Sequence, residues 1–313
     1  MKKAPLAETT AAPRSEGAAH LMMLVAMVIF ALNYIIGRWA VGDTPPYMMG
    51  FVRWGGAMII LLPIAWNHLR DDYDFIRRHW PLLCLAGFMM PFMVGGVSYV
   101  AMSHTTAINA GVLVTSTPVM AVLLSWMILK DRITGGVCLG ISLAIVGVLY
   151  IVSRGDPASL LSLSFNTGDL ILIGCNLSLA GYGVAIKKLP EGLHPLSLLI
   201  VVCAVGAFYH VPFVAYEMAS GEQVVLSAKS VVSLTFLAIF PSAVGILIWN
   251  SAIGRIGPGR VTFYMYLLPV FTAIFAVPLL GESIDIYHVV GAGLIVIGVT
   301  LAGRKPRGNQ AAT

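Results

Sequence analysis

AMSHTTAINAGVLVTSTPVMAVLLSWMILKDRITGGVCLGISLAIVGVLY, residues 101–150, has a counterpart 151 positions later in AIGRIGPGRVTFYMYLLPVFTAIFAVPLLGESIDIYHVVGAGLIVIGVTL, residues 252–301. The two stretches align without a gap. A proline in the middle, an acidic residue in a polar turn and two glycines seven residues apart recur in register. These paired positions are Pro118/Pro269, Asp131/Glu282, Gly140/Gly291 and Gly147/Gly298. Each copy is expected to form an apolar helix interrupted by proline, a tight polar turn and a second apolar helix, which indicates an internal repeat.

The composition is that of an integral membrane protein. Hydrophobic residues make up 58% of the chain and charged residues 11%, whereas an ordinary soluble domain carries roughly 25% charged residues. A soluble chain has no means of hiding this much apolar surface in consecutive runs, so the lipid bilayer is the first expected partner. The formal net charge of +5 does not indicate a nucleic-acid partner, because the basic residues lie in short loops between apolar runs.

The cysteines suggest no chemistry of their own. Cys84, Cys138, Cys175 and Cys203 all fall inside apolar runs at unrelated spacings. No disulfide framework, metal site or cofactor is predicted from them.

Ten apolar runs follow one another along the chain, each close to the roughly 20 residues that a helix needs to cross a bilayer. The runs are 20–40, 46–66, 80–101, 107–128, 133–153, 167–187, 194–216, 230–252, 258–280 and 284–303. The predicted fold is an all-α integral membrane protein with ten transmembrane helices in two inverted five-helix repeats, 20–153 and 167–303. Residues 1–19 are predicted to be a disordered cytoplasmic lead and residues 304–313 a cytoplasmic tail.

The placement of Lys and Arg orients the chain. With the N-terminus inside, 15 of the 19 basic residues fall in inner segments, which predicts cytoplasmic N- and C-termini in a bacterial inner membrane. Because each repeat crosses the membrane an odd number of times, the second repeat is inverted. The turn of the first repeat carries Lys130 and Arg132, whereas the equivalent outer turn carries Glu282 and Asp285 and no basic residue. Inverted halves place a substrate site near the midplane, and their rocking gives alternating access.

The second repeat carries a recognisable pattern. Pro269 in the ninth predicted helix is followed by the turn Leu280–Gly281–Glu282. The chain from about residue 20 to 303 resembles the EamA family of the drug/metabolite transporter superfamily, a family of ten-helix transporters. In the first repeat, Lys130–Asp131 stands where the family has glycine and glutamate, which keeps the acid and loses the glycine.

Two more features near the start of the chain match the family pattern. Asn33 followed by the basic Arg38 is similar to the family's first helix, and Arg53 corresponds to an arginine near the start of the second helix. The resemblance implies a carrier of amino acids, related metabolites, nucleotide-linked sugars or drugs, and it does not choose among them.

Arg53 is the most informative of the polar residues predicted to lie inside the membrane. A lone arginine near the bilayer centre costs roughly 2.5–3.5 kcal/mol on insertion scales. One interpretation is structural: the side chain extends toward the outer interface, only ~10 Å away at 1.5 Å per residue. The other is that Arg53 contacts a carboxylate or phosphate of the substrate.

Uncharged polar and aromatic residues supply the other candidates for the cavity. Interhelical hydrogen bonds are the ordinary use of asparagines such as Asn109 and Asn176, and an aromatic belt is the ordinary use of Tyr and Trp near helix ends. Residues deeper in the runs are better candidates, although Tyr264 and Tyr266 point about 200° apart on a helix, so at most one of them lines a cavity easily. The predicted substrate-binding residues are Asn33, Arg53, Tyr99, Tyr182, Trp249, Asn250, Tyr264 and Tyr266.

The prolines and glycines of the repeat have structural and functional interpretations. Pro118 and Pro269 remove backbone hydrogen bonds, and each is predicted to be a fixed kink, a hinge or a point where carbonyls face the cavity. The paired glycines favour close packing of the fifth and tenth helices, with a homodimer contact as the alternative.

Proton coupling has weak support in the sequence. His210, in the seventh run, is the only histidine considered as a candidate for proton coupling, and it has no partner at metal-ligand spacing. No acidic residue falls clearly within a predicted span: Asp169 is at the start of the sixth, and Glu282 is in a turn. Proton-driven carriers usually contain such a carboxylate, so uniport, exchange or facilitated export is favoured.

The predicted function is transport of a small-molecule substrate. No Ser/His pair, paired carboxylates, metal spacing or Gly-rich phosphate loop indicates an enzyme, and a receptor or scaffold would be expected to carry a large appended domain. Export of amino acids or related metabolites is the leading prediction, from the resemblance and from a polar, aromatic site without acids. A multidrug or cationic-compound exporter is the alternative, and the missing carboxylate counts against it.

Overall fold

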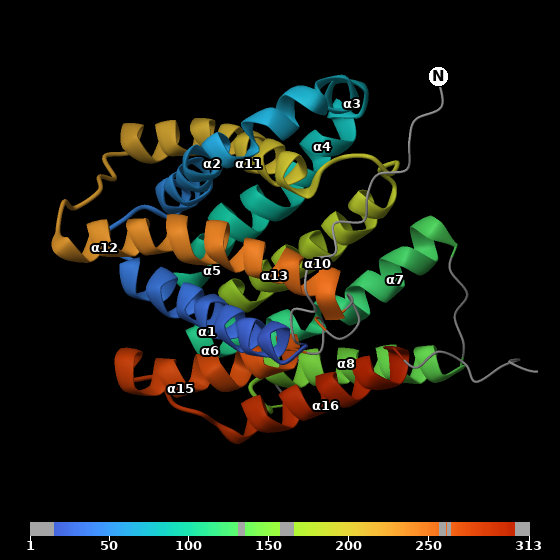
Figure 1. The fold of residues 1–313 in the computed structure, drawn as a ribbon. Coiled ribbons are helices and arrows are strands. Elements are labelled where there is room, and N and C mark those ends of the chain that lie inside the picture. Colours follow the sequence, from blue (N-terminus) through green and yellow to red (C-terminus); the bar gives the residue numbers. More distant parts are fainter. Residues whose placement is uncertain (1–15, 131–134, 157–165, 257–260, 262–263, 304–313) are drawn as a thin grey trace, which may run out of the picture.

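The computed structural model describes residues 16–130, 135–156, 166–256, 261 and 264–303, and helices are the only regular elements within them (Figure 1). The elements are α1 Glu16–Ala40, α2 Pro46–Asp71, α3 Tyr73–Arg78, α4 Trp80–Gly87, the π-helical η1 Phe88–Val97, α5 Ser98–Met102, α6 Ala107–Leu113, the 3₁₀ turn η2 Val114–Ser116, α7 Thr117–Leu129, α8 Gly135–Val152, α10 Thr167–Lys187, α11 Pro195–Ala219, α12 Ala228–Leu237, the π-helical η3 Ala238–Val244, α13 Gly245–Ile256, the 3₁₀ turn η4 Tyr264–Leu267, α15 Leu268–Leu280 and α16 Ile286–Gly303. Most of the predicted N-terminal lead, the tail 304–313 and the Asp131 turn lie outside the described residues.

The chain is a multi-pass membrane protein. Eight helical segments of the described chain are long and apolar enough to cross a bilayer. The prediction of ten spans is met for these eight; the last two segments, Tyr264–Leu280 and Ile286–Leu301, are apolar but shorter within the described residues.

The repeat seen in the sequence is also a repeat of structure. Helices α15 and α16 begin and end 151 residues after α7 and α8. Pro118 and Pro269 each occupy the first turn of a helix that follows a 3₁₀ turn, a position where proline loses no helical hydrogen bond. Lys130 (φ 61°) and Gly281 (φ 67°) then end α7 and α15 in the same left-handed conformation. The turn of the first repeat therefore keeps the backbone that glycine favours without the glycine.

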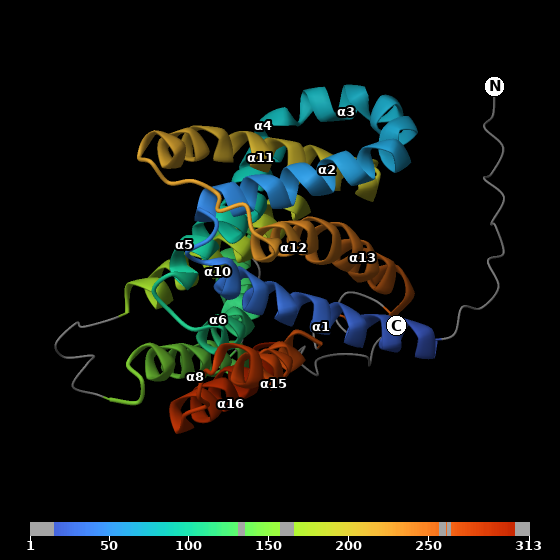
Figure 2. The same ribbon diagram turned by 90° about the vertical axis from the view of Figure 1, so that its left-hand side faces the viewer.

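Packing follows the same two-fold pattern. Helix α2 packs on α11 and α8 packs on α16, so that each of these pairs joins equivalent helices of the two repeats. Helix α1 packs on α13 and α15, and its counterpart α10 packs on η1 and α7. In both views α2 and α11 lie at one edge of the molecule and α8 and α16 at the opposite edge (Figure 1, Figure 2).

Two glutamates show that the paired elements are antiparallel. Glu217, in the last turn of α11, accepts hydrogen bonds from the backbone N–H groups of Tyr47 (2.8 Å) and Met48 (3.0 Å) at the start of α2. Glu282, just after α15, accepts them from Ala107 (2.8 Å) and Ile108 (2.9 Å) at the start of α6. Carboxylates are favourable at helix N-termini, where N–H groups lack helical partners. The end of one repeat's helix thus meets the start of the other's, as inversion requires.

The paired glycines bring α8 and α16 into backbone contact with each other. A Cβ at Gly147 would lie 2.8 Å from the carbonyl oxygen of Gly291, and a Cβ at Gly298 would lie 2.5 Å from that of Gly140. Such distances admit only hydrogen at these positions, which is the use of small residues between membrane helices. The predicted close packing of the fifth and tenth helices is therefore found within one chain.

Candidate substrate cavity

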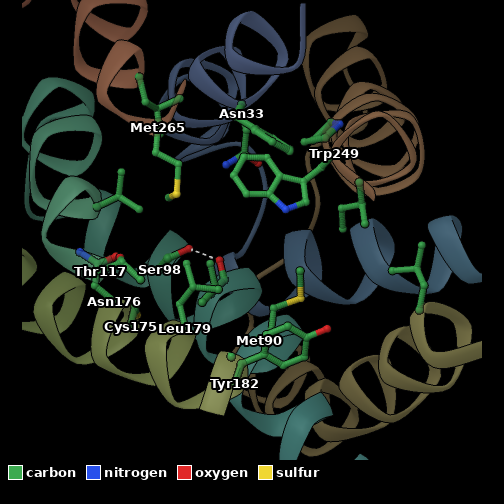
Figure 3. Close-up of a pocket in the computed structure, with 18 of the residues that line it drawn as sticks. Asn33, Met90, Ser98, Thr117, Cys175, Asn176, Leu179, Tyr182, Trp249 and Met265 are labelled. Carbon is green, nitrogen blue, oxygen red and sulfur yellow. Dashed lines mark hydrogen bonds between the residues drawn. The ribbon is translucent and has the colours of Figure 1, made fainter. Parts of the chain in front are cut away.

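A cavity of about 570 Å³ lies between the two repeats, and it has contributions from both. Its wall is largely apolar, with side chains such as Met27, Phe30, Leu179 and Met265. Figure 3 shows polar and aromatic side chains placed at intervals around it. The size is in the range of pockets for small organic ligands, roughly 300–1,000 Å³.

The proline-containing breaks of both repeats form equivalent parts of the wall. Val114 and Thr117 line the cavity from the first repeat, and Met265 and Leu268, 151 residues later, line it from the second. Discontinuous helices are the usual builders of sites at repeat interfaces. The two breaks therefore face the cavity, with Thr117 polar where its counterpart is leucine.

Arg53 is buried beside the cavity and held by a chain of hydrogen bonds. It is 6% exposed; its Nε donates to Ser242 Oγ (2.8 Å) and its Nη1 donates to Tyr99 Oη (2.9 Å). Tyr99 in turn donates to Asn33 Oδ1 (3.0 Å). The guanidinium also lies 4.7 Å from the ring centre of Trp54. These contacts fix the direction of the guanidinium.

No described acidic residue compensates the charge of Arg53. In the part of the chain that the structure describes, no Asp or Glu lies within ion-pair distance of it, and its remaining N–H donors have no partner. A buried charge without a partner is costly. A cation of this kind on a cavity wall suits an anionic ligand, which guanidinium groups bind through paired hydrogen bonds.

The predicted site residues fall into two groups. Five of them line the cavity: Asn33, Arg53, Tyr182, Trp249 and Asn250. Tyr99 is fully buried and joins Arg53 to Asn33. Tyr264 and Tyr266 are not in the described lining; Tyr264 Oη is hydrogen-bonded to His20 Nδ1, and it is Met265, between them, that lines the cavity. The 3₁₀ turn η4 replaces the regular helix from which their directions were predicted.

Four polar residues of the wall were missed as candidates: Tyr34, Ser98, Thr117 and Asn176. Asn176 was given the ordinary role of an interhelical hydrogen bond, yet its Nδ2 has no partner within the described residues. Thr117 is the last of three consecutive hydroxyl residues, Thr115–Thr117, directly before Pro118 in an otherwise apolar run. That cluster of hydroxyl residues at a helix break was the signal available in the sequence.

The prediction that no acid lies clearly within a span is wrong for Glu217, whereas Asp169 lies at the start of α10 as predicted. Helix α11 continues to Ala219 and includes Glu217, which is 5% exposed; its carboxylate is satisfied by the start of α2. Asp169, in the first turn of α10, is fully buried because Thr105 and Asn109 donate hydrogen bonds to it. Neither acid belongs to the cavity wall.

Asp169 belongs to a buried network that joins α6, α10 and α16, and we call Thr105, Asn109, Asp169 and His288 the Asp169 cluster. Asn109 Nδ2 donates to both carboxylate oxygens of Asp169 (3.1 Å each), and Asn109 Oδ1 is 2.9 Å from His288 Nε2. The backbone N–H of Asp285 donates to His288 Nδ1 (3.0 Å), so the ring proton is on Nε2 and donates to Asn109. The cluster ties two helices of the second repeat to one helix of the first.

The cavity approaches the end of the bundle opposite the Asp169 cluster. Its wall reaches Ile186 at the end of α10, Leu193 in the following turn and Pro195 at the start of α11. At the other end the residues of the Asp169 cluster are buried and outside the wall. His210, the predicted candidate for proton coupling, is likewise buried outside the wall, with Nδ1 donating to the Gly206 carbonyl oxygen at 2.7 Å.

The division of the chain into two repeats agrees with the comparison with protein families. The model of the EamA-like transporter family matches residues 17–153 and again residues 166–304. The chain belongs to this family. EamA proteins are transporters, and the two matches coincide with the two structural repeats.

Curated relatives of this EamA protein are named as transporters. It is 27% identical to the uncharacterized transporter YyaM of Bacillus subtilis (strain 168), over 90% of this chain and 92% of that protein. It is 26% identical to a probable terminal-alkyne amino-acid exporter of Streptantibioticus cattleyicolor, over 66% of this chain and 67% of that protein. It is 21% identical to a probable amino-acid metabolite efflux pump of Salmonella typhimurium, over 89% of this chain and 92% of that protein. A crystal structure with 17% identity superposes with a TM-score of 0.59 over 92% of this chain and 97% of the other, a likeness of fold.

Proposed function

We propose that this EamA transporter exports amino acids or closely related metabolites across the bacterial inner membrane, and that Arg53 binds the carboxylate of the substrate. The observation that carries the proposal is the uncompensated guanidinium on the wall of an otherwise largely apolar cavity. The names of two relatives, an amino-acid exporter and an amino-acid metabolite efflux pump, support the same substrate class.

The charge of the cavity argues against the alternative of a cationic-drug exporter. Arg53 is the only charged side chain among the described residues of the wall. A cationic compound would meet a like charge there with no carboxylate to offset it. The buried acids Asp169 and Glu217 have their acceptor positions taken by helix starts and side chains.

Alternating access between inverted repeats is the proposed mechanism. The chain would have its termini in the cytoplasm, and the cavity would face the cytoplasm in the present conformation. This orientation is supported by the exposed basic residues Arg70, Arg78 and Lys187, which belong to the end opposite the Asp169 cluster. Substrate would enter from that side, and separation of the repeats at the Asp169 cluster would release it.

Flux through reconstituted vesicles tests the proposal with a change of ligand charge. Wild-type protein is expected to carry an α-amino acid in strong preference to its carboxamide, because the amide lacks the anionic group. Arg53→Gln is expected to lose this preference, a loss of roughly 10–100-fold for one charge-assisted contact of about 1.5–3 kcal/mol.

Two variants separate binding by Arg53 from its structural role. Tyr99→Phe and Ser242→Ala each remove one hydrogen bond to the guanidinium but leave its charge in place. Both are expected to retain the preference for the carboxylate. If Arg53→Gln, correctly folded, transports the acid as well as wild type does, Arg53 is a structural residue and the proposed mode of binding is wrong.

A further inference from the structure

The polar side chains of the cavity differ in whether the protein itself satisfies them. Asn33 accepts a hydrogen bond from Tyr99, and Ser98 donates to the carbonyl oxygen of Val94. Asn176 and Thr117 are different. They are 6% and 7% exposed, and neither Asn176 Nδ2 nor Thr117 Oγ1 has a hydrogen-bond partner among the described residues.

The local backbone does not explain why Thr117 is unpaired. Its neighbours Thr115 and Ser116 donate to the carbonyl oxygens of Val112 (2.6 Å) and Leu113 (2.7 Å) within the same helix break. Buried polar groups in proteins nearly always have partners, and lipid supplies none. Eight buried polar atoms of the described residues have no partner, and only two of them, Thr117 Oγ1 and Asn176 Nδ2, belong to residues that line the cavity. A polar group that enters the cavity can therefore reach these two.

Thr117 and Asn176 come from different repeats, on helices α7 and α10, which pack on each other. Figure 3 shows them on one side of the cavity, with Asn33 and Trp249 on another. Asn33 is part of the hydrogen-bonded chain that holds Arg53. Apolar side chains, Met265 and Leu179 among them, complete the wall. The cavity therefore has two polar regions, one cationic and one neutral.

We propose that Asn176 and Thr117 form a second binding region, which hydrogen-bonds a neutral polar group of the substrate away from its carboxylate. This inference rests on the proposed function and narrows its substrate class to amino acids, or similar acids, whose side chain carries a hydroxyl or an amide. An amide and a hydroxyl together offer both donors and acceptors, so they match either group. A site built for such a group rejects an apolar substrate of equal size, because its own polar atoms would stay unpaired.

Pairs of substrates with nearly equal shape test this selectivity. Vesicles are loaded with threonine or valine, and with asparagine or leucine, and export is measured for each. Wild-type protein is expected to favour the polar member of a pair by about tenfold or more in kcat/KM. Thr117→Val and Asn176→Leu, which keep the side-chain shape, are expected to reduce the ratio to within about twofold.

The stability of the protein without substrate gives a second readout. Thr117→Val removes an unpaired buried hydroxyl and is expected to raise the melting temperature in detergent. Thr115→Val, two residues away, breaks a formed hydrogen bond at an equally buried position and is expected to lower it. A fall for both variants would mean that Thr117 has a structural partner, and would overturn the second binding region.

The outcomes also separate this inference from the proposed function. Export of amino acids with no preference within either pair would leave the proposed function standing and refute the second binding region. Export of none of the four amino acids would refute both.

Discussion

Removal of the negative charge from Asp169 is expected to open the end of the bundle that the Asp169 cluster closes. The carboxylate accepts hydrogen bonds from Asn109, at 3.1 Å to each oxygen, and from Thr105. Hydrogen bonds to a charged group contribute about 1.5–3 kcal/mol, against 0.5–1.5 for neutral pairs. Asp169→Asn keeps the side-chain shape and one acceptor, so the closed state of this end of the bundle is expected to lose about 1–3 kcal/mol of stabilisation. That loss corresponds to roughly a 5–150-fold shift of the equilibrium between the closed and open states.

Spin labels on the same end of the bundle measure this shift. His104 and Ile286 are exposed, and they lie at the starts of the segments that the cluster joins. Cysteines at these two positions, in protein whose four native cysteines are replaced by alanine, allow pulsed electron paramagnetic resonance in lipid nanodiscs. Asp169→Asn is expected to increase the population with the longer label–label distance.

An exposed acid nearby supplies the control for that experiment. Asp285→Asn makes the same change of charge at an exposed side chain and keeps the backbone N–H that donates a hydrogen bond to His288 Nδ1. It is expected to leave the distances unchanged. If Asp169→Asn gives the distribution of the parent protein, the cluster does not hold the repeats together and the reasoning is refuted.

Three further sets of substitutions test the glycine contacts, the left-handed turns and the Glu282 cap, each measured by thermal unfolding in detergent. Gly298→Ala places a Cβ 2.5 Å from the Gly140 oxygen and is expected to destabilise the protein by about 1–3 kcal/mol. As a control, Gly293→Ala on the same helix places a Cβ with nothing within 4 Å and is expected to be neutral or to stabilise the protein by up to ~1 kcal/mol. Equal effects of the two substitutions would contradict the close contact between α8 and α16. Gly281→Ala, at φ 67° with open space around it, is expected to destabilise the protein by about 1 kcal/mol. Lys130→Gly, at φ 61°, is expected to stabilise the protein by a similar amount. A Lys130→Gly protein less stable than its parent would show that the lysine side chain contributes more stability than its left-handed backbone costs. Glu282→Gln is expected to destabilise by about 1 kcal/mol, because a neutral amide caps the start of α6 less well than a carboxylate; unchanged stability would mean that this cap contributes nothing measurable.

The repeat could be predicted from the sequence because it depends on local features. A proline at a fixed offset from a turn acts within a few residues, and glycines seven apart share a helix face, so their roles follow from position alone. The exact agreement of α7 with α15 and of α8 with α16 bears this out. Arg53 was a candidate for the same reason, since a charge within an apolar run requires an explanation wherever it lies.

The details of the cavity wall depend on contacts that a sequence does not contain. The directions of Tyr264 and Tyr266 were predicted from a regular helix, and a 3₁₀ turn alters them. Asp169 and Glu217 looked like residues at the ends of spans; both are buried because helix starts and side chains from the other repeat reach them. Asn176 looked like an ordinary interhelical donor, and only the three-dimensional arrangement shows that its Nδ2 has no partner among the described residues.

The unequal pair Thr117 and Leu268 has a consequence for how a small molecule lies in the protein. A cavity made by two identical halves would bind an elongated substrate equally well in either of two opposite orientations. Here one half offers a hydroxyl at the position where the other offers a methyl-tipped branch, so the two orientations differ in energy and one is selected. Interchanging these two side chains would move the hydroxyl to the opposite repeat while Arg53 still bound the carboxylate, so a substrate with its polar group on the other side would be preferred.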